Sequence, residues 1–190
     1  MNDSNTKRHW ALSPLSTIYG LVTGIRNKLF DWKVLPSEEF DIPVISVGNL
    51  TVGGTGKTPH SEYLINLLKD RHKVALLSRG YKRKTKGFQL ATPESTAKEI
   101  GDEPYQIKAK FPNIHVAVDA DRRPGIRTLC KREETKDVEV ILLDDAFQHR
   151  YVTPSINIVL MDYNRPIYED AIMPMGMLRE PASSLQRAHI

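Results

Sequence analysis

Residues 42–70 run from an apolar stretch through a glycine-rich one into an amphipathic one, and this order constrains the fold more than any other feature. The stretch IPVISV (42–47) is rich in β-branched residues and predicts a buried strand. Glycines follow it, and a helix is expected to begin near Lys57. A buried strand that turns through glycines into a helix indicates a layered α/β fold. The helix is expected to turn four side chains inward: Tyr63, Leu64, Leu67 and Leu68.

Strand and helix patterns alternate along the rest of the chain. Near-continuous apolar runs predict four more strands, at 73–78, 114–118, 138–143 and 156–162, with helices expected at 102–110 and 123–133. Such an alternation indicates a mostly parallel sheet with helices on both faces. Sheets of this kind bind their ligands beyond the carboxyl ends of the strands, so candidate functional residues are expected there.

Composition narrows the class of protein but not its function. The chain has 190 residues, of which 40% are hydrophobic and 26% charged, as in an ordinary globular domain. Its single cysteine, Cys130, excludes an intrachain disulfide. The net charge of +4 is too small to indicate a nucleic-acid partner, and the basic stretch 79–86 contains one aromatic residue and no recognition motif. We therefore predict no binding to nucleic acid.

Residues 1–36 form a separate unit in this prediction. After a polar tail, apolar residues recur at helical spacing within 12–29, and Ser13-Pro14 fits a helix start with Ser13 as N-cap. Polar residues interrupt the segment too often for a membrane-spanning helix. Two interpretations remain open: a helix packed on the core, which periodicity favours, and a helix lying in a membrane interface with basic residues and Trp32 at the headgroups.

Residues 48–58, GNLTVGGTGKT, match a phosphate-binding loop except at its first glycine, where the chain has Thr51. In such a loop closely spaced glycines let several backbone N–H groups converge on phosphate oxygens, and the following helix adds its N-terminal dipole. Lys57 is predicted to reach the terminal phosphates, and the Thr58 hydroxyl to bind Mg²⁺. Nucleotide contacts are expected from a continuous run: Thr51, Val52, Gly53, Gly54, Thr55, Gly56, Lys57 and Thr58.

A pair of acidic residues follows the predicted strand 138–143. In VILLDDAFQH, Asp144 and Asp145 stand where an aspartate beside a phosphate loop can hold Mg²⁺ directly or through water. Adjacent carboxylates repel one another unless a cation lies nearby, so a metal ion accounts for the pair. The sequence leaves open which of the two binds the metal.

Three further features have both a structural and a functional interpretation. Asp102 can cap a helix, or it can accept the proton of an acceptor hydroxyl as a catalytic base. His149 can be structural, or it can orient an aspartate or contact a substrate. The basic stretch around Arg79, Lys82 and Arg83 can be a solvated loop, or it can bind an anionic substrate or lipid headgroups.

Together these motifs resemble the tetraacyldisaccharide 4′-kinase family, also called lipid A 4′-kinases. The combination of GNLTVGGTGKTP with DDAFQHR is far more specific than a glycine–lysine–threonine loop alone. In this family the loop begins at Gly48-Asn49 and carries a non-glycine residue at the position of Thr51, which accounts for the missing glycine. The resemblance extends from residue 12 to the end of the chain through seven segments: PLSTIYGLVTGIRNKLFD, ISVGNLTVGGTGKTP, LLSRGYKRK, GDEPYQ, VAVDADRRPGI, ILLDDAFQHR and MPMGMLREPASSLQRA.

The resemblance implies a P-loop NTPase-like fold with ATP and Mg²⁺ as cofactors. The implied reaction transfers the γ-phosphate of ATP to the 4′-hydroxyl of a tetraacylated glucosamine disaccharide 1-phosphate, giving lipid IVA. The implied catalytic residues are Lys57, Asp145 and Asp102, with Asp102 as the base. The implied metal site comprises Thr58, Asp144 and Asp145. Five residues become candidate substrate contacts: Arg79, Lys82, Arg83, His149 and Glu180.

The resemblance also implies a location and a domain organisation. It implies a peripheral enzyme at the cytoplasmic face of the inner membrane of Gram-negative bacteria, with the lipid disaccharide and the membrane surface as partners. Residues 1–36 become a tail and an amphipathic membrane-contact helix, which reverses the preference that periodicity alone gives. Residues 37–190 become the kinase core, truncated before the smaller α/β domain that closes over the nucleotide in family members and contributes a histidine.

A second class of function stays open on the sequence alone. It is a membrane-associated P-loop ATPase or GTPase that acts as a switch and has no small-molecule acceptor. A switch hydrolyses nucleotide without a lipid acceptor, whereas a kinase is expected to hydrolyse it slowly until the acceptor is added.

Overall fold

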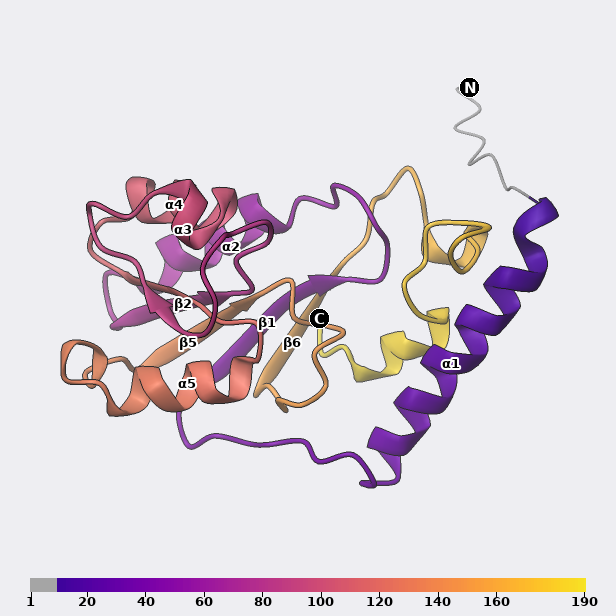
Figure 1. Ribbon diagram of the computed structural model, residues 1–190, viewed down its shortest axis with the longest axis horizontal. Coiled ribbons are helices and arrows are strands. Elements are labelled where there is room, and N and C mark those ends of the chain that lie inside the picture. Colours follow the sequence, from indigo (N-terminus) through magenta and orange to yellow (C-terminus); the bar gives the residue numbers. More distant parts are fainter. Residues whose placement is uncertain (1–9) are drawn as a thin grey trace.

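A six-stranded sheet in the order β3-β4-β2-β5-β1-β6 runs through the computed structural model, which describes residues 10–190 (Figure 1). Every neighbouring pair of strands is parallel except the edge pair β3 and β4, so the predicted mostly parallel sheet is confirmed. The strands are β1 (Val44–Asn49), β2 (Val74–Ser78), β3 (Gln89–Leu90), β4 (His115–Val118), β5 (Val140–Asp144) and β6 (Ile156–Leu160). The prediction lacks β3 because two residues are too few for a periodic pattern.

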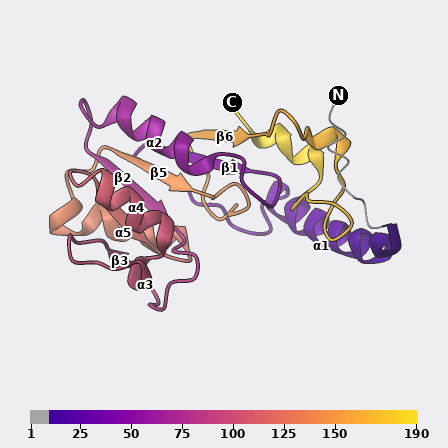
Figure 2. The same ribbon diagram turned by 90° about the horizontal axis from the view of Figure 1, so that it is seen from above.

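Helices cover both faces of the sheet, as predicted (Figure 1). Helices α2, α3 and α4 lie on one face and α5 lies on the other. The helices are α1 (Ser13–Asp31), α2 (Lys57–Leu68), α3 (Ala97–Ile100), α4 (Asp102–Lys110) and α5 (Arg122–Lys131), with short 3₁₀ helices at Trp10–Leu12, Glu133–Thr135, Ile167–Glu169 and Ala182–Arg187. In both views α1 lies beyond one end of the sheet, beside the chain that follows β6 (Figures 1 and 2).

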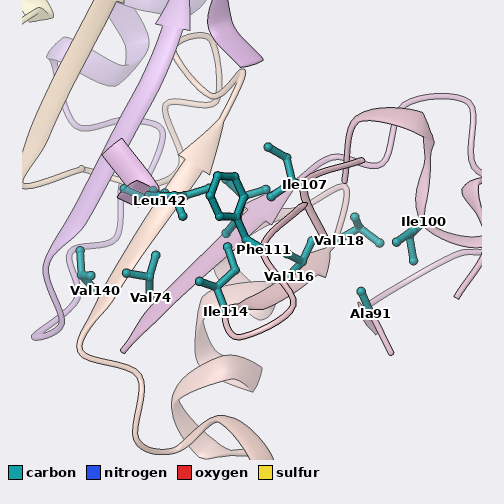
Figure 3. Close-up of a cluster of buried hydrophobic side chains, with 12 residues drawn as sticks. Val74, Ala91, Ile100, Ile107, Phe111, Ile114, Val116, Val118, Val140 and Leu142 are labelled. Atoms are coloured by element: carbon teal, nitrogen blue, oxygen red, sulfur yellow. The ribbon is translucent and has the colours of Figure 1, made fainter. Parts of the chain in front are cut away.

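Two apolar clusters hold the helices to the sheet. On one face, Ile100 of α3 and Ile107 of α4 pack against β2, β4 and β5 (Figure 3). Ile65 of α2 belongs to the same cluster. On the other face, Ile126 and Leu129 of α5 pack against the opposite side chains of the same strands. Successive residues of a strand point to opposite faces, so a strand covered on both sides is apolar throughout. That is why β2 and β5 are buried along their whole length.

Helix α2 presents a different face to the sheet from the one that periodicity predicts. Ile65 is fully buried, whereas Tyr63 and Leu67 are 61% and 55% exposed. Leu64 and Leu68 pack partly against the core, as expected. The apolar residues of this helix lie on more than one side of it, so their spacing alone does not identify the buried side. The predicted inward orientation of Tyr63 and Leu67 is therefore wrong.

Helix α1 turns its polar side toward the protein. Ser16 is buried, and its hydroxyl donates to the carbonyl of Ile172 at 2.6 Å; the Tyr19 hydroxyl donates to the carbonyl of Arg179 at 3.1 Å. Leu12, not Ser13, occupies the N-cap position, so the predicted cap is wrong. Five apolar side chains of the helix are more than half exposed: Leu15, Ile18, Leu21, Val22 and Ile25. The expectation that this apolar stripe packs on the core is wrong as well, although Phe30 near the end of α1 is buried.

The exposed apolar side of α1 does not make it a membrane-spanning helix. No helix within residues 10–190 combines the length and the hydropathy that crossing a bilayer requires. The polar tail predicted for the start of the chain, residues 1–9, lies outside the described residues.

Candidate functional site

The glycine-rich loop joins the carboxyl end of β1 to α2, as predicted. Gly53 and Gly56 have φ angles of 110° and 80°, a region that residues with a Cβ rarely adopt, so both positions need glycine. Gly56 is the N-cap of α2, and the unbonded amides of the first helical turn therefore face the loop. The amide group of Asn49 donates to the Thr55 hydroxyl at 2.7 Å and holds the two ends of the loop together. These features provide the open backbone and helix N-terminus that phosphate binding requires.

The loop entrance explains why a glycine is absent there. Thr51 forms an antiparallel β-bridge with Leu178, and the amide of Arg179 donates to the carbonyl of Leu50 at 2.7 Å. Pairing of this kind requires an extended backbone, which a β-branched residue favours and glycine does not. Threonine therefore suits the position better than the glycine of the general motif.

The same pairing changes which amides are available to a phosphate. The amide of Val52 donates to the carbonyl of Met177 at 2.8 Å, and Thr51 is buried. The predicted direct nucleotide contacts of Thr51 and Val52 are therefore not supported. The amides that remain for phosphate begin at Gly53.

The two acidic residues lie opposite the loop because β5 is the neighbour of β1. Asp144 ends β5 with its side chain buried, and the hydroxyls of Ser61 and Ser78 lie 3.4 and 3.5 Å from its carboxylate oxygens. Asp145 follows with a φ of 46°, and its Oδ1 lies 3.6 Å from Nζ of Lys57. The loop lysine and the acidic pair thus meet at the carboxyl edge of the sheet, as the sequence predicts.

Burial makes Asp144 an unfavourable place for a negative charge. Loss of solvent raises the pKa of its carboxyl from 3.8 to about 6, and the nearby carboxylates of Glu103 and Asp145 add to the increase. A divalent cation would reverse this penalty, so the chemistry of the pair fits Mg²⁺. Within residues 10–190 no three acidic, histidine or cysteine side chains enclose a metal position. Protein ligands from Asp144, Asp145 and Thr58 would therefore share the ion with phosphate and water oxygens, as Mg²⁺ commonly requires.

A basic pocket of about 440 Å³ opens beside Asp145. Four arginines from separate parts of the chain line it: Arg26 of α1, Arg79 after β2, Arg122 of α5, and Arg179. Tyr19, Gln148 and His149 complete the polar lining. Of these residues, sequence reasoning identified only Arg79 and His149. The others lie on elements that only the tertiary fold brings together.

Arg122 is the most deeply buried of the four arginines, at 2% exposure. Burial, together with the positive charge of Arg79, lowers the pKa of its guanidinium to about 10. Its Nη2 donates to the carbonyl of Asp144 at 3.2 Å, while its Nε is buried without a hydrogen-bond partner among the described residues. A buried cation with unused donor capacity favours the binding of an anion.

His149 lies in the pocket as a neutral imidazole. Burial lowers its pKa to about 4, and the charge of Arg122 contributes to the decrease. Its Nε2 lies 3.3 Å from the amide nitrogen of Arg122 and 3.5 Å from Oδ1 of Asp121. Sequence reasoning left both a structural and a substrate-binding role open, and this position is compatible with both.

Asp102 lies at the start of α4 but does not cap it. Gly101, with a φ of 94°, is the N-cap, so the predicted capping role of Asp102 is wrong. The Asp102 side chain is exposed. The charge of its neighbour Glu103 contributes to the raised pKa of Asp144. Sequence reasoning noted Glu103 only as a complement to the helix dipole.

Two of the predicted substrate contacts are engaged within the protein. Arg83 donates to the carbonyls of Gly87 and Val118, at 2.7 and 3.4 Å, and so closes its own loop. Glu180 is buried, accepts a hydrogen bond from Asn27 at 3.0 Å and forms an ion pair with Arg187. Direct substrate contacts of Arg83 and Glu180 are therefore not supported.

The other two basic candidates, Arg79 and Lys82, both have exposed side chains. Arg79 lines the basic pocket. Lys82 lies over the ring of Tyr81. Of the two, only Arg79 is placed beside the acidic pair.

Comparison with known proteins connects this site to a family. The family model described as Tetraacyldisaccharide-1-P 4′-kinase matches residues 8–190. The chain is 59% identical over 190 residues to the tetraacyldisaccharide 4′-kinase of Parabacteroides distasonis, covering 100% of this chain and 52% of that protein. It is 62% identical over 179 residues to that of Phocaeicola vulgatus, covering 94% and 49%. The chain thus spans about half the length of the curated relatives it matches.

A solved structure has the same fold. The crystal structure of the "apo" form of LpxK from Aquifex aeolicus in complex with ATP matches with a TM-score of 0.86 at 40% identity, covering 94% of this chain and 56% of that one. The P-loop NTPase-like fold that the sequence predicts is confirmed. Because the family model spans almost the whole chain and the fold agrees, this chain belongs to the tetraacyldisaccharide 4′-kinase family.

Proposed function

We propose that this chain forms the ATP-binding core of a kinase that phosphorylates the 4′-hydroxyl of tetraacyldisaccharide 1-phosphate to give lipid IVA. The observation that carries the proposal is the 3.6 Å approach of Lys57 to Asp145, a residue that also lines the arginine-rich pocket. A phosphate loop, an acidic pair and a basic pocket at one edge supply a donor site, a metal position and an acceptor site.

On the donor side, the loop amides from Gly53 onward and the ammonium group of Lys57 bind the phosphates of ATP. Mg²⁺, when bound, neutralises charge on these phosphates; Thr58, Asp144 and Asp145 are the residues that hold it. Phosphoryl transfer depends mainly on positioning and charge stabilisation, which is the chemistry that these residues offer.

On the acceptor side, the four arginines of the basic pocket suit a phosphate monoester. The acceptor named for the family carries a 1-phosphate, and we assign that group to this pocket. Asp102, in the exposed first turn of α4 next to Glu103, serves as the base that accepts the proton of the 4′-hydroxyl. A nucleotide switch needs no second anion site, so the pocket favours the kinase over the switch.

Transfer of label from [γ-³²P]ATP to the disaccharide 1-phosphate lipid, followed by thin-layer chromatography, tests this function. We expect Mg-ATP binding by this chain and lipid phosphorylation by the full-length Parabacteroides distasonis relative, measured in parallel. Replacing the lipid by one that lacks the 1-phosphate should weaken acceptor binding by at least about tenfold. ATP hydrolysis that the lipid leaves unchanged would instead support the switch.

We further propose that α1 places the protein on a membrane surface, at the cytoplasmic face of the inner membrane. The support is the row of exposed apolar side chains on the side of α1 that faces away from the protein, together with Trp32, which is 69% exposed. Apolar residues and tryptophan on one side of a surface helix are typical of helices that lie in a membrane interface. The acyl chains of the acceptor would then remain in the bilayer while its sugar reaches the site.

We expect the double substitution Ile18→Glu and Val22→Glu to lower binding to anionic phospholipid vesicles by more than about tenfold. Each substitution removes an apolar side chain whose transfer from water into the membrane interface contributes roughly 1.5–3 kcal/mol to binding. Both side chains are 60% exposed, so the unfolding midpoint should stay unchanged. Tyr63→Glu with Leu67→Glu is the matched control, because these residues form an exposed apolar pair with the same spacing on α2. Vesicle co-sedimentation measures both; equal losses in the two variants would contradict a specific role of α1.

A further inference from the structure

Arg165 lies against the phosphate loop, although nothing in the sequence motif includes it. Its Nη2 donates to the carbonyl of Val52 at 3.3 Å. The same nitrogen would lie 3.7 Å from a Cβ built on Gly53. Arg165 reaches this position because β6 is parallel to β1 and directly beside it, so both strands lead into their loops at one edge of the sheet. The segment after β6 thus supports the loop after β1.

The hydrogen bond controls the direction of one particular amide. A trans peptide is planar, and its C=O and N–H point in opposite directions. The carbonyl of Val52 and the amide of Gly53 belong to the same peptide, so holding the carbonyl on one side turns the amide to the other. That amide is the first one left for phosphate, because the amide of Val52 is bonded to Met177.

Without such a hold this peptide is free to rotate. Gly53, with a φ of 110°, is followed by Gly54, and neither residue has a side chain to restrict its backbone. On the other side, the pairing of residues 50–52 with 177–179 fixes the backbone up to Val52 and no further. The rigid part of the loop entrance therefore ends at the peptide that Arg165 holds.

We propose that Arg165 is a positioning residue that locks the peptide between Val52 and Gly53 with the Gly53 amide directed into the phosphate site. This role rests on the proposed ATP binding. The positive charge of the guanidinium beside the loop also favours an anionic ligand. Arg165 acts through the backbone of Gly53 rather than by chemistry of its own.

The first test observes the peptide itself in nucleotide-free protein by ¹⁵N NMR. Arg165→Gln is expected to shift or broaden the amide resonance of Gly53, because the released peptide exchanges between two orientations. Arg132→Gln is the matched control, since Arg132 pairs with Glu134 beyond the end of α5. An unchanged Gly53 resonance in Arg165→Gln overturns the proposal, and so does a general shift of core amides with a lowered unfolding midpoint.

The second test measures Mg-ATP binding by calorimetry. Arg165→Gln is expected to raise the Kd about tenfold, whereas Arg132→Gln leaves it unchanged. Arg165→Lys retains a cationic donor without the planar guanidinium and should give an intermediate Kd. If Arg165→Gln does not fold, the Kd of Arg165→Lys is compared with that of the wild type instead. A wild-type Kd in either Arg165 variant overturns the proposal. If the wild-type chain binds no ATP, the proposed function fails, while the Gly53 resonance still decides the role of Arg165.

Discussion

Replacing Lys57 by alanine is expected to abolish phosphoryl transfer and to weaken Mg-ATP binding by at least about a hundredfold. The ammonium group is the one cation that the loop itself contributes, and it lies 3.6 Å from Asp145. Charge stabilisation is the main contribution of the protein to phosphoryl transfer, so its loss removes most of the rate. Labelled phosphate transfer in the full-length relative and calorimetry with this chain measure the two effects.

The fold should survive this substitution. Asp145 keeps Arg179 as a partner, with Nη1 of Arg179 3.2 Å from Oδ1, so its carboxylate is not left uncompensated. Lys110→Ala is the matched control, since Lys110 at the end of α4 forms an ion pair with Glu62 of α2. Unchanged Mg-ATP affinity in Lys57→Ala would remove the basis of the nucleotide site.

Asp144→Asn is expected to stabilise the protein at neutral pH while it weakens Mg-ATP binding by at least about a hundredfold. The pKa of Asp144 is raised from 3.8 to about 6 in the folded protein. The folded state therefore holds this proton more tightly than the unfolded state does, and it loses stability as the pH rises from 3.8 through 6. A shift of this size corresponds to a free energy on the order of 3 kcal/mol. The asparagine variant does not titrate and avoids this loss.

Urea unfolding at pH 4.5 and at pH 7.5 checks the expected pH dependence. The difference in free energy of unfolding between Asp144→Asn and wild type should be larger at the higher pH. Asp70→Asn, at an exposed aspartate, should show no such change. A pH-independent difference for Asp144→Asn would mean that the folded protein does not disfavour the charge at this position.

The sequence predicts those parts of the molecule in which local pattern and tertiary environment agree. Strands β2, β4 and β5 are apolar except at one terminal residue each, and a sheet covered on both faces accommodates them. The phosphate loop is recognisable because its glycines have to be there: Gly53 and Gly56 adopt positive φ angles. The meeting of Lys57 with Asp145 then follows from the adjacency of two parallel strands.

Local patterns fail where the partner of a residue is remote in sequence. Arg26, Arg122 and Arg179 lie far apart along the chain, and only the assembled fold makes them line one pocket. Helix α1 is misjudged for a related reason: periodicity reveals an apolar side but does not say whether protein covers it. The family resemblance makes Glu180 a candidate substrate contact, yet in the fold its carboxylate forms an ion pair with Arg187.

The pairing of the loop entrance with residues 177–179 also bears on how the protein is made. β1 leaves the ribosome early, but both of its neighbours, β5 and β6, are synthesised much later, and Met177 later still. The nascent chain therefore carries an unpaired apolar strand until β5 and β6 have been synthesised, which is a feature that chaperones bind and that promotes aggregation. The loop entrance can reach its paired form only after residues 177–179 have been synthesised.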